Sequence, residues 1–179
     1  AIKLDSMDTE AYKSLYRLHL SEGNYKSAEI EYKRLVKLGG RLKDSTDFVN
    51  QLIYNVDNRI DAGRADYKAK QGLNLILKYD QYFLARMLSN ARSNYQNLNY
   101  RVSDIYLEKY NRYMFAMTGE AKYEYFRIKA YILLEVKMYQ EALDLFSQVT
   151  KYSKRECYIG VAMAKYELGH SEEGWMAYF

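Results

Sequence analysis

The feature that most constrains the fold is a succession of apolar stretches with helical spacing, separated by short polar breaks. Apolar side chains recur every three to four residues in Ala11–Leu20, Ile128–Val136 and Leu143–Val149. The chain contains no Pro, which would cost about 3 kcal/mol inside a helix. The pattern predicts an all-α fold in which short breaks join antiparallel helices. The expected breaks are Glu22–Asn24, Gly39–Gly40, Ala62–Arg64, Asn97–Asn99, Thr118–Gly119 and Leu168–His170.

A repeated template occurs three times along the chain. It consists of a polar turn, a small residue five positions after the turn starts, and an aromatic residue four positions later. The small residue allows two helices to approach closely, and the aromatic one helical turn away fills the space between neighbouring helix pairs. The three copies are Gly23–Ala28 with Tyr32, Lys137–Ala142 with Phe146, and Gly169–Gly174 with Tyr178.

With this template the chain resembles the tetratricopeptide repeat (TPR) family, whose unit is a helix–turn–helix of about 34 residues. The resemblance implies a right-handed superhelix, or solenoid, of antiparallel helical hairpins. The matching positions include Tyr12, Leu15, Gly23, Tyr25, Ala28 and Tyr32; Phe126, Ala130, Tyr139, Ala142 and Phe146; and Tyr158, Ala162, Gly169 and Tyr178. Five irregular repeats are expected near residues 9–42, 49–80, 84–116, 123–154 and 155–179, with starts spaced by 40, 35, 39 and 32 residues.

Some positions depart from the family pattern. Tyr16 stands where the family usually has Gly or Ala, and Gly174 replaces the small Ala of the last copy. Both ends of the sequence look cut within a helix. The last helix carries the apolar residues Trp175, Met176 and Phe179, where a polar capping surface is expected. We therefore expect residues 1–179 to form a single repeat domain, as a fragment of a longer protein or with ends that self-associate.

A weaker resemblance is to the repeat regions that follow the receiver domain in some bacterial response regulators. It rests on Val36–Gly40, Ser45–Asp47 and Gly160–Ala164. The order of the segments is reversed here, and the chain contains no receiver domain. This resemblance implies an output or regulatory module in signalling as an alternative function.

Catalytic and metal chemistry find little support. A structural zinc site usually has four Cys or His ligands, whereas the chain offers Cys157, His19 and His170, far apart in sequence. We interpret Cys157 and His19 as packing residues and His170 as a solvated turn residue. No glycine-rich phosphate loop and no apolar run of about 18 residues occur. We therefore predict neither an enzyme nor a cofactor or metal site, and no membrane span. One cysteine and no secretory signal favour the cytoplasm, with the periplasm left open.

The resemblance places the concave groove on the first helix of each repeat. Four cations there, with Tyr, Leu and Met between them, would favour an acidic and apolar peptide, although these cations could equally serve only to solubilise the surface. The candidate partner-binding residues are Lys13, Arg17, Leu20, Arg92, Tyr95, Arg127, Tyr131, Met163 and Tyr166.

The chain is thus expected to be a protein–protein interaction scaffold or adaptor. The alternatives are the signalling module, a self-assembling structural segment, and binding of single-stranded nucleic acid. The last would use Arg101, Lys109 and Arg112 with the tyrosines between them, but acidic residues intervene.

Overall fold

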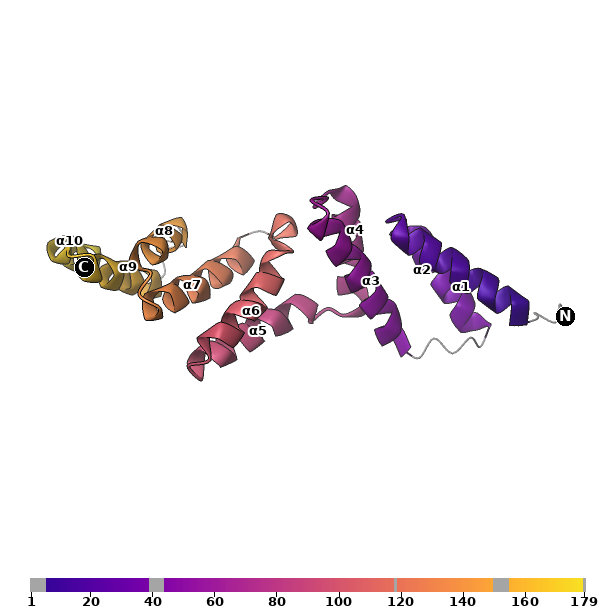
Figure 1. Ribbon diagram of the computed structural model, residues 1–179, viewed down its shortest axis with the longest axis horizontal. Coiled ribbons are helices and arrows are strands. Elements are labelled where there is room, and N and C mark those ends of the chain that lie inside the picture. Colours follow the sequence, from indigo (N-terminus) through magenta and orange to yellow (C-terminus); the bar gives the residue numbers. More distant parts are fainter. Residues whose placement is uncertain (1–5, 39–43, 118, 150–154, 179) are drawn as a thin grey trace. The chain divides into compact units, whose positions relative to one another are not determined.

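Every regular element of the described chain is a helix. The computed structural model describes residues 6–38, 44–117, 119–149 and 155–178 (Figure 1). Within these ranges no strand occurs, and the helices pack in sequential neighbouring pairs. The expectation of an all-α fold is confirmed.

The chain divides into two compact units, Ala1–Phe83 and Leu84–Phe179. The first contains α1 (Ser6–Ser21), α2 (Tyr25–Lys37), α3 (Asp44–Asp61) and α4 (Tyr67–Tyr79). Helix α5 (Phe83–Gln96) starts at the boundary. The second unit continues with α6 (Tyr100–Asn111), a short 3-10 helix (Met114–Ala116), α7 (Glu120–Glu135), α8 (Tyr139–Val149), α9 (Arg155–Glu167) and α10 (Ser171–Tyr178).

Five turns in the described chain have the same backbone hydrogen bonds. In the first, Gly23 N–H donates to Leu20 O at 3.0 Å and Asn24 N–H donates to His19 O at 2.8 Å. This pattern is a Schellman cap, which requires a left-handed residue after the helix. The left-handed residues are Gly23, Gly63, Leu98, Lys137 and Gly169. Their separations of 40, 35, 39 and 32 residues equal the spacings expected from the sequence.

Aromatic rings join the two helix pairs of the first unit. Helix α1 contacts α3 and α2 contacts α4, so that each pair contributes one helix to each of two layers. Tyr32 stacks on Phe48 with ring centroids 4.2 Å apart, and the edge of the Tyr79 ring meets Phe48 at 5.1 Å. Tyr16 lies 5.9 Å from Phe48. The departure at Tyr16 therefore has a packing role, because its ring fills space that a small residue would leave empty.

Small residues occur where helices approach most closely. Ala28 and Ala142 are fully buried. A Cβ on Gly160 would lie 2.2 Å from Cζ of Phe146, and one on Gly174 would lie 2.9 Å from the carbonyl oxygen of Ala162. Glycine at position 174 thus allows a closer contact than the alanine that the family pattern expects.

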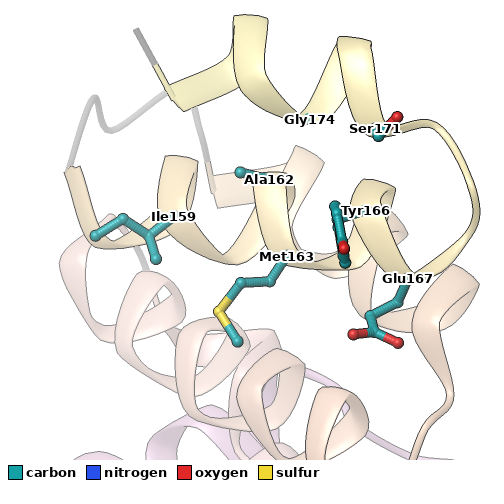
Figure 2. Close-up of a pocket in the computed structure, with 7 residues that line it drawn as sticks. All are labelled: Ile159, Ala162, Met163, Tyr166, Glu167, Ser171 and Gly174. Carbon is teal, nitrogen blue, oxygen red and sulfur yellow. The ribbon is translucent and has the colours of Figure 1, made fainter.

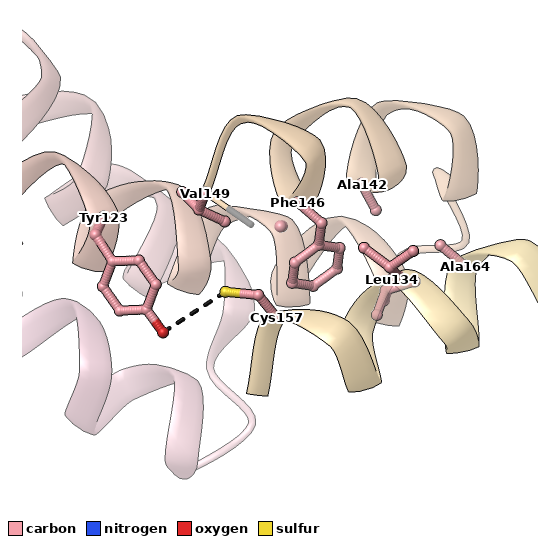
Figure 3. Close-up of a cluster of buried hydrophobic side chains, with 9 residues drawn as sticks. Tyr123, Leu134, Ala142, Phe146, Val149, Cys157 and Ala164 are labelled. Atoms are coloured by element: carbon pink, nitrogen blue, oxygen red, sulfur yellow. Dashed lines mark hydrogen bonds between the residues drawn. The ribbon is translucent and has the colours of Figure 1, made fainter. Parts of the chain in front are cut away.

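The core of the second unit gathers around Phe146, between α7, α8 and α9 (Figure 3). Leu134, Ala142 and Ala164 belong to the same cluster of buried side chains. At one end of this cluster the Cys157 thiol donates to the Tyr123 hydroxyl, with Sγ and oxygen 3.6 Å apart. Cys157 is fully buried, in agreement with its interpretation as a packing residue.

Some sequence predictions lie outside the described residues. These include the break at Gly39–Gly40, Thr118 of a later break, and the side chains of Trp175, Tyr178 and Phe179. Met176 is described and is 73% exposed. Among the described helices, none combines the length and the apolar character needed to cross a membrane.

Candidate functional site

A polar groove lies between α1 and α3 in the first unit. Its volume is about 690 Å³. Helix α1 contributes positions 10, 13 and 17, and α3 contributes positions 47, 50, 51 and 54, in each case one face of the helix. The lining residues are Glu10, Lys13, Tyr16, Arg17, Asp47, Asn50, Gln51 and Tyr54.

Several polar groups in this groove are not used by the fold. Lys13 Nζ donates to Glu10 Oε1 at 2.6 Å. Within the described ranges, the side chains of Arg17, Asp47 and Asn50 make no hydrogen bond or ion pair. Guanidinium, carboxylate and amide groups that remain unused in a groove can bind the backbone and polar side chains of a peptide.

The charges along the groove balance. Lys13 and Arg17 are opposed by Glu10 and Asp47. The basic surface predicted from the sequence included Lys13 and Arg17 of α1 but no residue of α3. The acidic residue on α3 cancels part of that charge, so this groove gives no preference for an acidic partner.

Tyr16 forms the floor of the groove. It is only 2% exposed, and its hydroxyl has no hydrogen-bond partner in the described structure. Burial raises the pKa of this phenol, and the nearby charges of Arg17 and Asp47 act on it in opposite directions. At the rim, Tyr54 is 66% exposed and presents an aromatic surface to solvent.

Leu20 was expected in the groove but is buried at 1% exposure. It belongs to the last turn of α1. Leu20 is therefore not part of an accessible surface in this structure. Helical spacing places Leu20 near Arg17 along the helix, but it does not say which of two adjacent faces a neighbouring helix covers.

The predicted cations of the second unit are bound to one carboxylate. Arg127 Nε donates to Glu124 Oε2 at 3.0 Å, and Arg92 Nε donates to Glu124 Oε1 at 3.0 Å. Burial opposes ionisation of Glu124, but hydrogen bonds from Arg127 and Arg92 outweigh it and lower the pKa of this carboxyl. Both guanidiniums thus have an intramolecular partner.

Two further predicted residues, Tyr95 and Tyr131, are half-buried and lie close together. Their ring centroids are 6.4 Å apart, and the Tyr131 hydroxyl donates to the carbonyl oxygen of Glu156 at 2.6 Å. These contacts hold the rings in place, and the Tyr131 ring also meets Phe146 edge-on.

Met163 and Tyr166 line a separate apolar hollow of about 420 Å³ formed by residues of α9 and α10 (Figure 2). They are 49% and 62% exposed. Figure 2 shows Ala162 on the side of α9 that faces α10, and Met163 pointing away from α10. The predicted site residues therefore lie in several places: Lys13 and Arg17 in one groove, and Met163 and Tyr166 in another.

Two of the three tyrosine rings that the nucleic-acid alternative would use are buried. Tyr110 and Tyr113 are 2% and 1% exposed. Lys109 lies over the ring of Tyr106, 5.7 Å from its centroid. Rings that are buried in the core cannot stack on bases, so this segment does not support the nucleic-acid alternative.

Sequence analysis missed the α3 side of the groove. Asp47, Asn50, Gln51 and Tyr54 follow the spacing of one helical face, which was the available signal. The repeat that contains them resembles the family pattern weakly, so their alignment with α1 became evident only from the contact between the two helices.

The chain was compared with known protein-family models, with curated protein sequences and with solved structures, and none of them matches it. In the described part of the structure, no group of three or more His, Cys, Asp or Glu side chains is placed to hold a metal ion.

Proposed function

We propose that this chain is a protein-interaction module that binds a peptide segment of a partner protein in the α1–α3 groove. The observation that carries the proposal is the set of polar side chains lining this groove that make no bond within the described fold. A peptide supplies matching groups along its backbone, and the exposed ring of Tyr54 offers an apolar contact.

The same proposal includes a finer architecture: five TPR-like hairpins stacked as a solenoid. The five identical turns, their spacing, and the small residues at close helix contacts support it. In such a repeat protein each hairpin is stabilised by its neighbours, and surfaces formed by equivalent helices bind the partner. An adaptor role within a larger protein, in the cytoplasm, is consistent with this architecture.

The proposal is tested by selecting peptides from a random library on the full chain and measuring their affinity by calorimetry. Arg17→Ala with Asn50→Ala should weaken the selected peptide about tenfold or more, since each substitution removes a direct polar contact. Met163→Ala with Tyr166→Ala, in the α9–α10 hollow, is the matched control and should leave the affinity unchanged.

The opposite result would contradict the proposal. If the control pair weakens binding and the groove pair does not, the binding site lies at α9–α10. If no peptide is enriched, the function as a peptide-binding module is wrong.

A further inference from the structure

Positive charge is concentrated on α2 and α4, in the layer of the first unit that does not line the α1–α3 groove. These two helices carry seven Lys or Arg residues and two Glu residues. Helix α4 contains no acidic residue, whereas α3 contains four Asp and one Arg. The surplus of five positive charges on α2 and α4 exceeds the net charge of +4 of the whole chain.

Three of these cations, Lys26, Lys70 and Lys78, line a hollow of about 450 Å³ between the two helices, here called the α2–α4 hollow. Helix α4 lines it along one face, with residues at intervals of three and four. Tyr67 at one end is 72% exposed. The lining consists of Tyr25, Lys26, Glu29, Tyr67, Lys70, Gln71, Asn74, Leu75 and Lys78.

The chain's own Glu29 shows how this hollow binds a carboxylate. Lys78 Nζ donates to Glu29 Oε1 at 2.7 Å, the Tyr79 hydroxyl donates to the same oxygen at 3.0 Å, and Lys33 Nζ lies 2.9 Å from it. Burial opposes ionisation of Glu29, but these hydrogen bonds outweigh it and lower its pKa to about 2. A single carboxylate is thus held by two ammonium groups and a phenol.

Two other lysines in the hollow have no such partner. Lys26 and Lys70 are exposed and make no ion pair within the described residues. Beside them, the amides of Gln71 and Asn74 can donate to and accept from a peptide backbone. Two ammonium groups and two amides in one hollow match a chain that carries several carboxylates.

We propose that the α2–α4 hollow binds an acidic peptide segment, rich in Asp and Glu, at a site separate from the α1–α3 groove. An acidic peptide fits better than a nucleic acid, because the hollow offers two lysines without an ion pair and two amides that can bond to a peptide backbone. In addition, the exposed ring of Tyr67 lies at one end of the hollow and not along its length, where bases would have to stack. We therefore assign the acidic partner expected from the sequence to the α2–α4 face, because the positive charge of this face is not balanced by acidic residues.

The test measures binding of a fluorescein-labelled oligoglutamate peptide to the full chain by fluorescence anisotropy at low salt. Lys26→Gln with Lys70→Gln should weaken binding about tenfold, and added salt should weaken the wild-type complex. Lys109→Gln with Lys137→Gln removes the same charge from the second unit and serves as the matched control. The affinity of this control variant for oligoglutamate should stay within about twofold of the wild type.

Three results would overturn the proposal. The first is the absence of oligoglutamate binding at low salt. The second is an equal loss in both double variants, which would mean that net charge alone attracts the peptide. The third is tighter binding of a labelled oligothymidine than of oligoglutamate, with the same dependence on Lys26 and Lys70, which would make this face a nucleic-acid surface.

Discussion

Tyr16 combines a packing role with a position under the candidate groove. Its ring contacts Tyr32 and Phe48, while its buried hydroxyl has no hydrogen-bond partner among the described residues. A buried hydroxyl without a partner costs about 1–3 kcal/mol, because its bonds to water are lost and not replaced. The ring stabilises the fold, and the hydroxyl does not.

Tyr16→Phe is therefore expected to raise the free energy of unfolding by about 1 kcal/mol, since it removes only the unsatisfied group. Urea unfolding monitored by circular dichroism measures this change in the free energy of unfolding. Tyr110→Phe is the matched control: the Tyr110 hydroxyl donates to Ala121 O at 3.2 Å, so its loss should cost about 1 kcal/mol. Equal destabilisation by both substitutions would show that the Tyr16 hydroxyl is bonded.

Lys137 is a second residue whose backbone conformation disfavours a side chain. Its φ of 65° is left-handed, and it closes the turn between α7 and α8. Glycine adopts this conformation without the steric cost of a Cβ.

Lys137→Gly should therefore stabilise the chain by roughly 1 kcal/mol, measured by the same urea unfolding. Lys109→Gly, inside α6, should instead destabilise it by about 1 kcal/mol. A loss of stability at position 137 would indicate that the turn is not left-handed in solution.

At the scale of elements, the helices and their turns could be predicted from the sequence because both depend on nearby residues. The spacing of apolar residues predicts the helices, and the polar residues between them predict the turns, including those where Leu98 and Lys137 occupy the left-handed position in place of glycine. The side-chain surroundings could not be predicted, because they depend on contacts between separate helices. Burial of Leu20 and pairing of Arg92 with Glu124 are set by residues on other helices.

The contact between α8 and α9 depends on Gly160. Gly160→Ala would place a methyl group within 2.2–2.6 Å of three atoms of the Phe146 ring. Because that ring is fully buried, the overlap should lower the free energy of unfolding by about 1–3 kcal/mol.

A double-mutant cycle provides the control for this prediction. Phe146→Leu opens space at the contact, so Gly160→Ala should lower the free energy of unfolding less in the Phe146→Leu background than in the wild type. Additive costs in urea unfolding would show that the two residues do not touch.

The contact between α2 and α4 depends on pH through Glu29. Its folded pKa of about 2 lies below the ordinary value of 4.5. A carboxyl with a lowered pKa contributes stability that is fully present above its unfolded pKa and is lost as pH falls through the folded pKa. The stability of the wild type should therefore decrease as pH falls from about 4.5 to about 2.

Glu29→Gln should make that decrease smaller, as measured by thermal unfolding at a series of pH values. Glu141→Gln is the control, because Glu141 is exposed on α8 and makes no ion pair within the described residues. An unchanged pH dependence in Glu29→Gln would mean that the ion pairs between α2 and α4 do not form.

At the scale of the molecule, the first unit presents two surfaces of different chemistry. The α1–α3 groove has balanced charge and unused polar groups, whereas the α2–α4 hollow has a surplus of lysines. A module with two such surfaces can hold two different partner segments at once.

The most direct test of the central proposal is to map the selected peptide on the chain by two-dimensional NMR. The account predicts that the largest amide shifts on titration fall at residues 10–17 of α1 and 47–54 of α3, where the groove residues lie. Shifts confined to α9 and α10, around Met163 and Tyr166, would contradict it and place peptide binding in the other unit.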